Sequence, residues 1–300
     1  MNRQPKYRFY ATLLDSFEGY LHSDLLWEEY WGKSENPGKT AEEFEAEQFQ
    51  GLIDRINRVP FDSEAADRGT AFNEIVDCLI LGRRSEKMEI ERVYKHGNVD
   101  PYDVCDRFCR ERNCDFSRQC GKYLDAYNRA IDSLPKEVEA LKATFNNRQF
   151  TFPISLCREF AEYFKGAVPQ VLTKALLPTR YGEVQLYGYI DELMPLSVHD
   201  IKTTGKYSVG KFRHNWQHRV YPYCLIESGN PIFDFEYNVA ALTFAFGRAD
   251  GRLLKAETFT EAYRFDPDRD VPILTEHCER LVEFLEANRH LITDTRIFGE

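Results

Sequence analysis

The segments 184–191 (VQLYGYID) and 198–203 (VHDIKT) decide the fold of this chain. Both are apolar and contain the β-branched and aromatic residues that favour strands, and a short turn that contains Pro195 separates them. We therefore predict that the two segments form a β-hairpin.

The predicted hairpin gathers charged side chains on one face. If its turn is centred on residues 194–197, Asp191 lies directly across from Asp200, with Cβ atoms about 5 Å apart. Side chains alternate along a strand, so Lys202 shares the face of Asp200, whereas Ile190 and Ile201 point to the other side, into a core. Two carboxylates and one ammonium group are thus expected on a common surface.

Two facing carboxylates repel each other unless a cation lies between them, and ligand sets made only of oxygen suit Mg²⁺ or Mn²⁺. Such an ion activates water and neutralises charge on a phosphate, and a neighbouring lysine can orient that water. The pattern therefore indicates phosphodiester hydrolysis. The alternative is structural: Asp191 caps a turn, and Asp200 and Lys202 form a surface ion pair.

Basic charge is concentrated just after the hairpin. The segment 202–219 contains five Lys or Arg residues and no Asp or Glu, although the whole chain has a net charge of −10. Local positive charge with interleaved aromatic residues is typical of surfaces that bind a nucleic-acid backbone. The candidate phosphate contacts are Lys206, Lys211, Arg213 and Arg219. The alternative is an ordinary solvated face beside an amphipathic helix over 214–227, and both interpretations can hold together.

These motifs resemble the PD-(D/E)XK nuclease superfamily, and within it the branch of RecB-type and phage lambda-type exonucleases. The resemblance lies in Gly188-x-x-Asp191, Asp200-x-Lys202-Thr203 and Gln217-x-x-x-Tyr221, in the order and approximate spacing of that branch. It implies that Asp191, Asp200 and the backbone carbonyl of Ile201 bind the metal ion and that Lys202 serves the attacking water. It also implies supporting or DNA-contacting roles for Gln217 and Tyr221.

The same branch has an earlier helix that brings one more metal ligand, and the segment 67–81 resembles it. RecB-type members have histidine four residues after a glycine there, where this chain has Asn73 after Gly69. Lambda-type members have a glutamate near that position, and Glu74 is one residue away. Because Asn73, Glu74 and Asp77 share one helix face, any of them could reach the ion, and we favour Glu74. The alternative is that Glu74 and Asp77 only cover the polar side of the helix.

The resemblance and the hydrophobic pattern together predict an α/β (α+β) fold with a restriction-endonuclease-like core, in which helices flank a central mixed β-sheet. No linker of glycine, serine and proline divides the chain, so we expect a single domain over 1–300. Its parts are a mainly helical region 1–166 with the helix 67–81, a catalytic sheet 167–265 with the helix 214–227, and a C-terminal helical region 266–300. Predicted helices cover 10–31, 40–59, 67–81, 104–113, 117–146 with a break near Pro135, 153–166 and 272–291. Predicted strands cover 171–177, 184–191, 198–203, 233–246 and 253–265, the last two joined at Asp250 and Gly251.

Composition indicates a soluble, cytoplasmic protein: there is no apolar signal core, and no run approaches the ~20 apolar residues of a membrane helix. Four of the eight cysteines, Cys105, Cys109, Cys114 and Cys120, cluster within sixteen residues. Related nucleases that bind an iron–sulfur cluster place one cysteine before the catalytic core and three after it. Here all four precede Asp191, which favours free thiols over an iron–sulfur or zinc site.

The sequence thus predicts an Mg²⁺- or Mn²⁺-dependent DNA exonuclease. The resemblance implies linear duplex ends as substrate and a phage or recombination setting, with a single-strand annealing protein as a partner. Two alternatives stay open: a non-catalytic nucleic-acid-binding module of the same fold and a structure-specific endonuclease.

Overall fold

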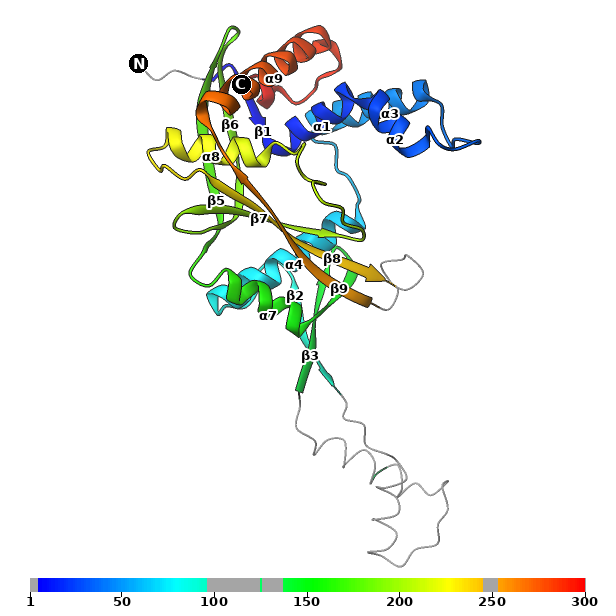
Figure 1. Cartoon of the computed structure of the whole chain (residues 1–300), viewed down its shortest axis with the longest axis vertical. Helices are drawn as coiled ribbons and strands as arrows, with labels where there is room; N and C mark the ends of the chain where they lie inside the picture. The colour runs from blue at the N-terminus through cyan, green and yellow to red at the C-terminus, as the bar shows by residue number, and fades with distance from the viewer. Residues whose placement is uncertain (1–4, 96–124, 126–136, 245–252, 300) are drawn as a thin grey trace, which may run out of the picture. The chain divides into compact units, whose positions relative to one another are not determined.

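The computed structural model describes residues 5–95, 125, 137–244 and 253–299 (Figure 1). The chain divides into two compact units, one formed by Met1–Gly69 with Phe164–Glu300 and the other by Thr70–Tyr163. Helix α4 (Glu64–Leu81) begins in the first unit and continues into the second. The predictions for the helix 104–113, the turn at Asp250 and Gly251, and the cysteines Cys105, Cys109, Cys114 and Cys120 lie outside the described residues.

The first unit contains a mixed β-sheet in the order β1-β6-β7-β8-β9, with β5 paired to β6. Its pairs β1–β6 and β7–β8 are parallel, and β5–β6, β6–β7 and β8–β9 are antiparallel. The strands are β1 (Tyr7–Tyr10), β5 (Val168–Thr179), β6 (Gly182–Leu193), β7 (Ser197–Thr204), β8 (Asp234–Phe244) and β9 (Leu253–Arg264). The predicted strands after residue 166 are therefore confirmed, and β1 is an addition that the sequence did not indicate.

Strand β6 organises the sheet. β5 pairs with it from Gly182 to Leu193 on one side, except at Asp191. On the other side, β1 pairs with residues 184–187 of β6 and β7 pairs with Glu192 and Leu193. Among the described residues, the stretch 188–191 of β6 therefore has no ladder partner in β1 or β7.

Helices flank this sheet. Helix α8 (Gln217–Glu227) packs on β5 and β6, and α1 (Ala11–Leu21) contacts α3 (Ala41–Ile56), α8 and α9 (Pro267–Ala287). Their apolar sides join those of β6, where Val184, Leu186 and Ile190 are fully buried, in one core. The single helix predicted over 10–31 is instead two, because His22 leaves helical geometry (φ −117°, ψ 28°) and α2 (Ser23–Trp31) begins after it.

The second unit contains a three-stranded antiparallel sheet and was predicted poorly. Its strands are β2 (Glu89–Lys95), β3 (Glu137–Phe145) and β4 (Arg148–Pro153), and α7 (Ile154–Tyr163) packs on the last two. The helix predicted over 117–146 is wrong for residues 137–145, which form β3. Asn146 and Asn147 adopt positive φ angles of 48° and 60°, the conformation of a two-residue hairpin turn, and this turn folds β4 back onto β3.

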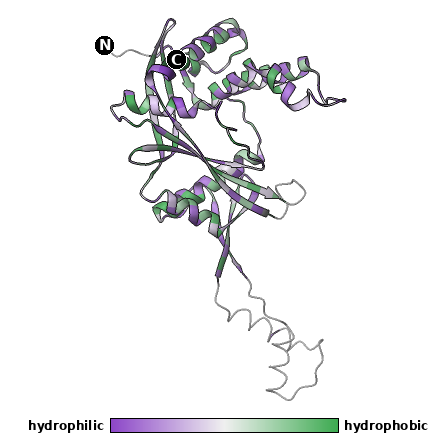
Figure 2. Ribbon diagram, viewed as in Figure 1, coloured by the Kyte–Doolittle hydropathy of each residue, from purple (hydrophilic) through white to green (hydrophobic). Residues whose placement is uncertain are grey.

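The whole is a mixed α/β protein with N-terminal helices, a central mixed sheet flanked by helices, and a small antiparallel sheet. Hydrophobic and hydrophilic residues alternate along the helices and strands (Figure 2). Among the described residues, no helix has the length and apolarity needed to cross a membrane.

Candidate active site on strands β6 and β7

The hairpin formed by β6 and β7 brings the predicted acidic residues together. Its turn is closed by a hydrogen bond from the Met194 N–H to the Ser197 carbonyl (3.0 Å), and the ladder pairs are Glu192 with His199 and Leu193 with Val198. Continued by one step, this register places Asp191 opposite Asp200, as the sequence predicts.

Beyond that ladder, the side chain of Asp191 bonds to the backbone of β7. Its Oδ2 atom accepts a hydrogen bond from the backbone N–H of Ile201 (2.9 Å). Ile190 is fully buried and Ile201 is 5% exposed.

Asp200, Lys202 and Gln217 form a closed ring of interactions. The Lys202 ammonium lies 2.7 Å from Asp200 Oδ2 and donates a hydrogen bond to Gln217 Oε1 (2.8 Å). Gln217 Nε2 in turn donates to Asp200 Oδ1. Asp200 and Gln217 are both almost fully buried, so this ring is shielded from solvent, where its charge-assisted bonds are strongest.

Lys202 is held in its charged form. Burial by itself would lower the pKa of Lys202, but the ion pair with Asp200 and the charges of Asp191 and Asp15 outweigh it and raise the pKa. Burial raises the pKa of Asp200, and Lys202 and Gln217 oppose that effect. An ammonium that stays protonated can hold an oxyanion or a water molecule, and it is not available as a general base.

Asp15 on α1 is a functional candidate that the sequence did not reveal. Its Oδ1 atom accepts a hydrogen bond from the backbone N–H of Trp216 (2.6 Å), the residue that precedes α8. Burial raises the pKa of Asp15 to about 7, with a further contribution from Asp200, whereas the Trp216 N–H and Lys202 lower it. Asp15 therefore lies within electrostatic reach of the site and fixes the start of the helix that carries Gln217.

Tyr221 follows Gln217 by one helical turn on α8 and is 4% exposed. Burial raises its pKa well above the usual value, and the negative charge of Asp200 adds to this effect. The phenol therefore stays neutral, and its position suits a residue that shapes the site.

The donor set fits one hard divalent cation. Asp191 and Asp200 supply carboxylates and Ile201 a backbone carbonyl, and Mg²⁺ is commonly bound through one or two carboxylates while it keeps several waters. Within the described ranges there is no group of three or more His, Cys, Asp or Glu side chains placed to hold a metal ion. The geometry thus suits an ion completed by water and substrate better than a closed protein cage.

Glu74 belongs to the second unit, where its carboxylate has local partners. It lies 2.9 Å from the Arg83 guanidinium and 2.8 Å from the Lys87 ammonium. Burial would raise the pKa of Glu74, but hydrogen bonds from Lys87 and Arg83 outweigh it and lower the pKa to about 2. Asn73 and Asp77 lie on the same helix of this unit, with Asp77 almost fully buried. The metal-binding role of Glu74 stays a prediction.

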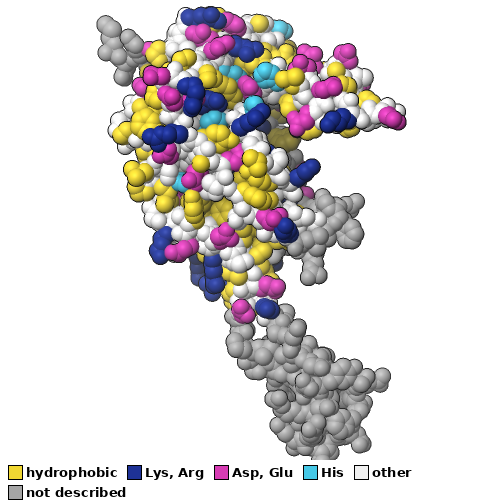
Figure 3. Space-filling view, viewed as in Figure 1, with side chains coloured by type: hydrophobic (Ala, Val, Ile, Leu, Met, Phe, Trp, Pro, Cys, Tyr) yellow, Lys and Arg dark blue, Asp and Glu magenta, His cyan; other side chains and the backbone are white. Residues whose placement is uncertain are grey.

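The four basic residues predicted to contact phosphate fall into two groups. Lys206, Lys211 and Arg213 are exposed, and Lys211 donates hydrogen bonds to Thr204 Oγ1 and to the Lys206 carbonyl, both 2.6 Å long. Arg219 instead forms an ion pair with Asp270 (3.2 Å). Positive and negative side chains are interspersed on the face shown in Figure 3.

The cysteines in the described part of the chain, Cys78, Cys157, Cys224 and Cys278, are free thiols. Burial raises the pKa of each of them, so none is activated as a nucleophile.

Comparison with known proteins adds little. No family model matches the chain, and no curated protein matches it. Among solved structures, the chain is similar to one described as the crystal structure of SSO0001, with 13% sequence identity and a TM-score of 0.29, over 68% of this chain and 83% of that chain. So distant a similarity leaves the function to be inferred from the site itself.

Proposed function

We propose that this protein is a metal-dependent nuclease that hydrolyses DNA phosphodiester bonds. The observation that carries the proposal is the convergence of Asp191 and Asp200, from adjacent antiparallel strands, with the Lys202 ammonium 2.7 Å from Asp200. The resemblance of these motifs to PD-(D/E)XK nucleases supports the same chemistry.

Each residue of the site has a defined part in this proposal. Asp191, Asp200 and the carbonyl of Ile201 would hold Mg²⁺ or Mn²⁺, which when bound supplies an activated water and charge neutralisation at the phosphate. Lys202, as a cation, holds the attacking water or a non-bridging phosphate oxygen in place. Gln217 fixes the distance between Asp200 and Lys202 by bonding to both.

The substrate follows from the basic segment and the mode of action from resemblance. Lys206, Lys211 and Arg213 are exposed and can bind the backbone of a nucleic acid. Because the motif pattern is that of phage and recombination exonucleases, we propose an exonuclease that acts on linear duplex ends, with a single-strand annealing protein as a partner.

A second candidate is a nucleic-acid-binding module without catalytic activity. It is favoured by the closed ring of Asp200, Lys202 and Gln217, in which the lysine neutralises the carboxylate without a metal ion. The lack of a third acidic ligand among the described residues points the same way.

The two candidates are separated by incubating the protein with linear, nicked circular and covalently closed duplex DNA in the presence of Mg²⁺, Mn²⁺ or EDTA. We expect degradation of linear DNA with metal only, abolished by Lys202→Ala and unaffected by Lys174→Ala, which removes an exposed lysine on β5. Cleavage of closed circles would identify an endonuclease. Binding without cleavage under every condition would favour the non-catalytic module.

A further inference from the structure

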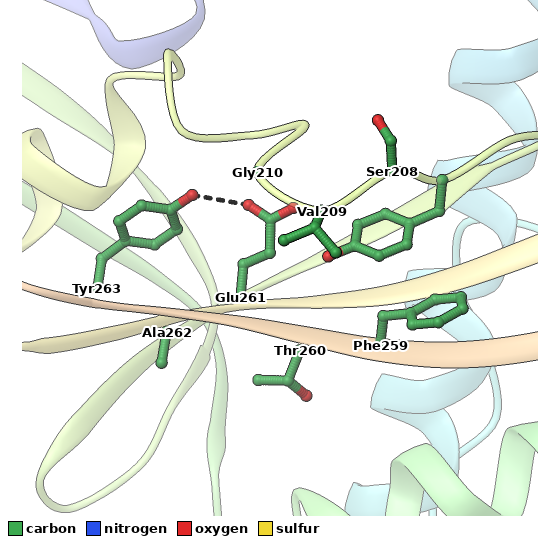
Figure 4. Close-up of a pocket in the computed structure, with 9 residues that line it drawn as sticks. Ser208, Val209, Gly210, Phe259, Thr260, Glu261, Ala262 and Tyr263 are labelled. Atoms are coloured by element: carbon green, nitrogen blue, oxygen red, sulfur yellow. Dashed lines mark hydrogen bonds between the residues drawn. The ribbon is translucent and has the colours of Figure 1, made fainter.

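A pocket of about 600 Å³ opens between the loop 207–210 and strand β9, outside the candidate active site (Figure 4). Figure 4 shows Phe259, Glu261 and Tyr263 on the side of β9 that faces the loop, and Thr260 and Ala262 on the opposite side. The lining residues are Tyr207, Ser208, Val209, Gly210, Phe259, Thr260, Glu261, Ala262 and Tyr263.

The pocket contains a carboxylate with unused hydrogen-bonding capacity. Glu261 is only 8% exposed, and its Oε2 atom accepts hydrogen bonds from the Tyr263 hydroxyl (2.7 Å) and the Phe212 N–H (3.3 Å). Its Oε1 atom is buried and has no hydrogen-bond partner at normal bonding distance among the described residues, although the carboxylate is near enough to the Tyr207 hydroxyl to raise the pKa of Tyr207. A buried acceptor left in this way is costly, so it indicates a ligand that donates a hydrogen bond.

Aromatic rings form the wall of the pocket. The rings of Tyr207 and Phe259 are stacked with centroids 4.4 Å apart and an angle of 22° between their planes. Phe259 is 37% exposed, so the stack is open to a further flat group. Aromatic surfaces of this kind bind nucleobases by stacking.

Two lysines flank the loop of the pocket in the sequence. Lys206 precedes the loop and Lys211 follows it, and both are exposed. A ligand that contacts all three kinds of group therefore has a negative charge near the lysines, a flat ring against the aromatic side chains and a hydrogen-bond donor near Glu261. A nucleotide whose base has an exocyclic amine has these three features in this order.

The pocket lies on the same sheet face as the candidate active site. Asp200 on β7 is paired with Tyr237 on β8, and Tyr237 is paired with Glu261 on β9. Directly paired side chains point to the same face, and two strand spacings separate the Asp200 and Glu261 backbones by roughly 10 Å. At a rise of about 3.4 Å per nucleotide, this is about three nucleotides along a stacked strand.

We propose that this pocket binds the base of one unpaired nucleotide, within a few positions of the phosphate to be cleaved, and prefers cytosine or adenine to thymine. The amino group of the base donates to Oε1 of Glu261, as a glutamate accepts from the N4 amine of cytosine. Thymine is disfavoured because its one ring N–H lies between two carbonyl oxygens, which the carboxylate repels. This inference rests on the proposed function, because it assumes that the chain binds DNA.

Binding is measured in EDTA, where no hydrolysis occurs, by fluorescence anisotropy of duplexes with single-stranded tails of dC, dA or dT. We expect the protein to bind dC and dA tails at least about 5-fold more tightly than dT tails. Glu261→Gln should remove this preference, because an amide can donate to thymine as well as accept from an amine. Glu257→Gln removes the same charge from the same strand outside the pocket lining and should keep the preference. Tyr207→Ala should weaken binding of all three tails about 5-fold or more.

Hydrolysis with Mg²⁺ or Mn²⁺ is measured on the same proteins, together with Lys202→Ala. Loss of hydrolysis in Lys202→Ala with the base preference intact supports the pocket, as does a preference that depends on Glu261 in a protein that cleaves nothing. If the protein hydrolyses DNA but shows no base preference, or if the preference persists in Glu261→Gln, the proposed base-binding role of the pocket is wrong and the proposed nuclease function still stands. Absence of DNA binding by the unaltered protein overturns both. Thermal melting of Glu261→Gln and Tyr207→Ala identifies any variant that fails to fold.

Discussion

The backbone of Gly188 on β6 lies against the ring of Tyr221 on α8 so closely that a methyl group on Gly188 would be 2.6 Å from Cε1 of Tyr221. Tyr221 is 4% exposed and packed in the core, so its ring has little freedom to move away. This close contact fixes α8, which carries Gln217, against β6, the strand that carries Asp191.

Gly188→Ala should therefore destabilise the protein by about 1–3 kcal/mol, the usual cost of overpacking a core. The measurement is urea unfolding followed by fluorescence. Gly51→Ala is the matched control, because no atom lies within 4 Å of the added methyl group on α3, and it should be neutral or stabilising by up to about 1 kcal/mol. Equal stability of Gly188→Ala and the parent protein would show that Tyr221 is not held as described.

Gln217→Ala should reduce nuclease activity by about 10- to 100-fold, the usual effect of removing a group that orients metal ligands. Gln217 bonds to both Asp200 and Lys202, so its loss frees these two side chains without removing either. Initial rates of DNA hydrolysis at several metal concentrations provide the test. A variant as active as the parent would show that the bonds from Gln217 are not needed to position Asp200 and Lys202.

Asp15→Asn should raise the Mg²⁺ or Mn²⁺ concentration needed for half-maximal activity by several-fold. The change removes a negative charge within reach of Asp200 and Lys202, while the amide oxygen can still accept the hydrogen bond from Trp216. Metal titrations of the hydrolysis rate report this shift. An unchanged titration curve would show that Asp15 does not affect metal binding and has only the structural role of fixing the start of α8.

His277 should make the protein less stable in mild acid. Burial, aided by Arg280 and Arg219, lowers the pKa of His277 from 6.5 to about 4, despite the hydrogen bond that its Nε2–H donates to the Leu14 carbonyl. The unfolded chain therefore binds this proton near pH 6.5 and the folded chain only near pH 4, so stability falls as the pH falls through this window.

Between pH 7 and pH 5 the loss due to His277 is about 2 kcal/mol. His277→Phe keeps a ring to stack on Trp216, where the present ring centroids are 3.9 Å apart, and removes the titrating group. Urea unfolding at both pH values should show a smaller loss for the variant, whatever its stability at pH 7. Parallel pH dependence in the two proteins would contradict the assignment.

Lys206→Ala should affect DNA binding, whereas Arg219→Ala should affect thermal stability. Lys206 is exposed, so its loss should weaken DNA binding and reduce the salt dependence of the binding constant by about one unit of slope. Arg219 is engaged with Asp270, so its loss should lower the melting temperature and leave the salt slope nearly unchanged. Anisotropy titrations at several salt concentrations and thermal melting distinguish the two outcomes, and a reversed pattern would assign the phosphate contact to Arg219.

The sequence succeeded where the signal was local. Residues 184–203 span one hairpin, so the local pattern alone could predict both strands, the turn between them and the burial of Ile190 and Ile201. It failed in the second unit, where residues 137–145 of the helix predicted over 117–146 form β3. The alternation of polar and apolar residues along β3 is incomplete, and the turn at Asn146 and Asn147 was the signal that could have corrected the prediction.

The sequence by itself determined which charged groups the β6–β7 hairpin presents, because neighbouring residues on a strand have fixed directions. Only the tertiary structure decided which distant groups join them: Asp15 from α1, and Glu261 from β9 opposite Tyr237. The pairing of strands and the packing of helices depend on the fit of surfaces far apart in the chain. No periodicity within one segment encodes that fit, so both the neighbour of the site and the pocket beside it appeared only with the fold.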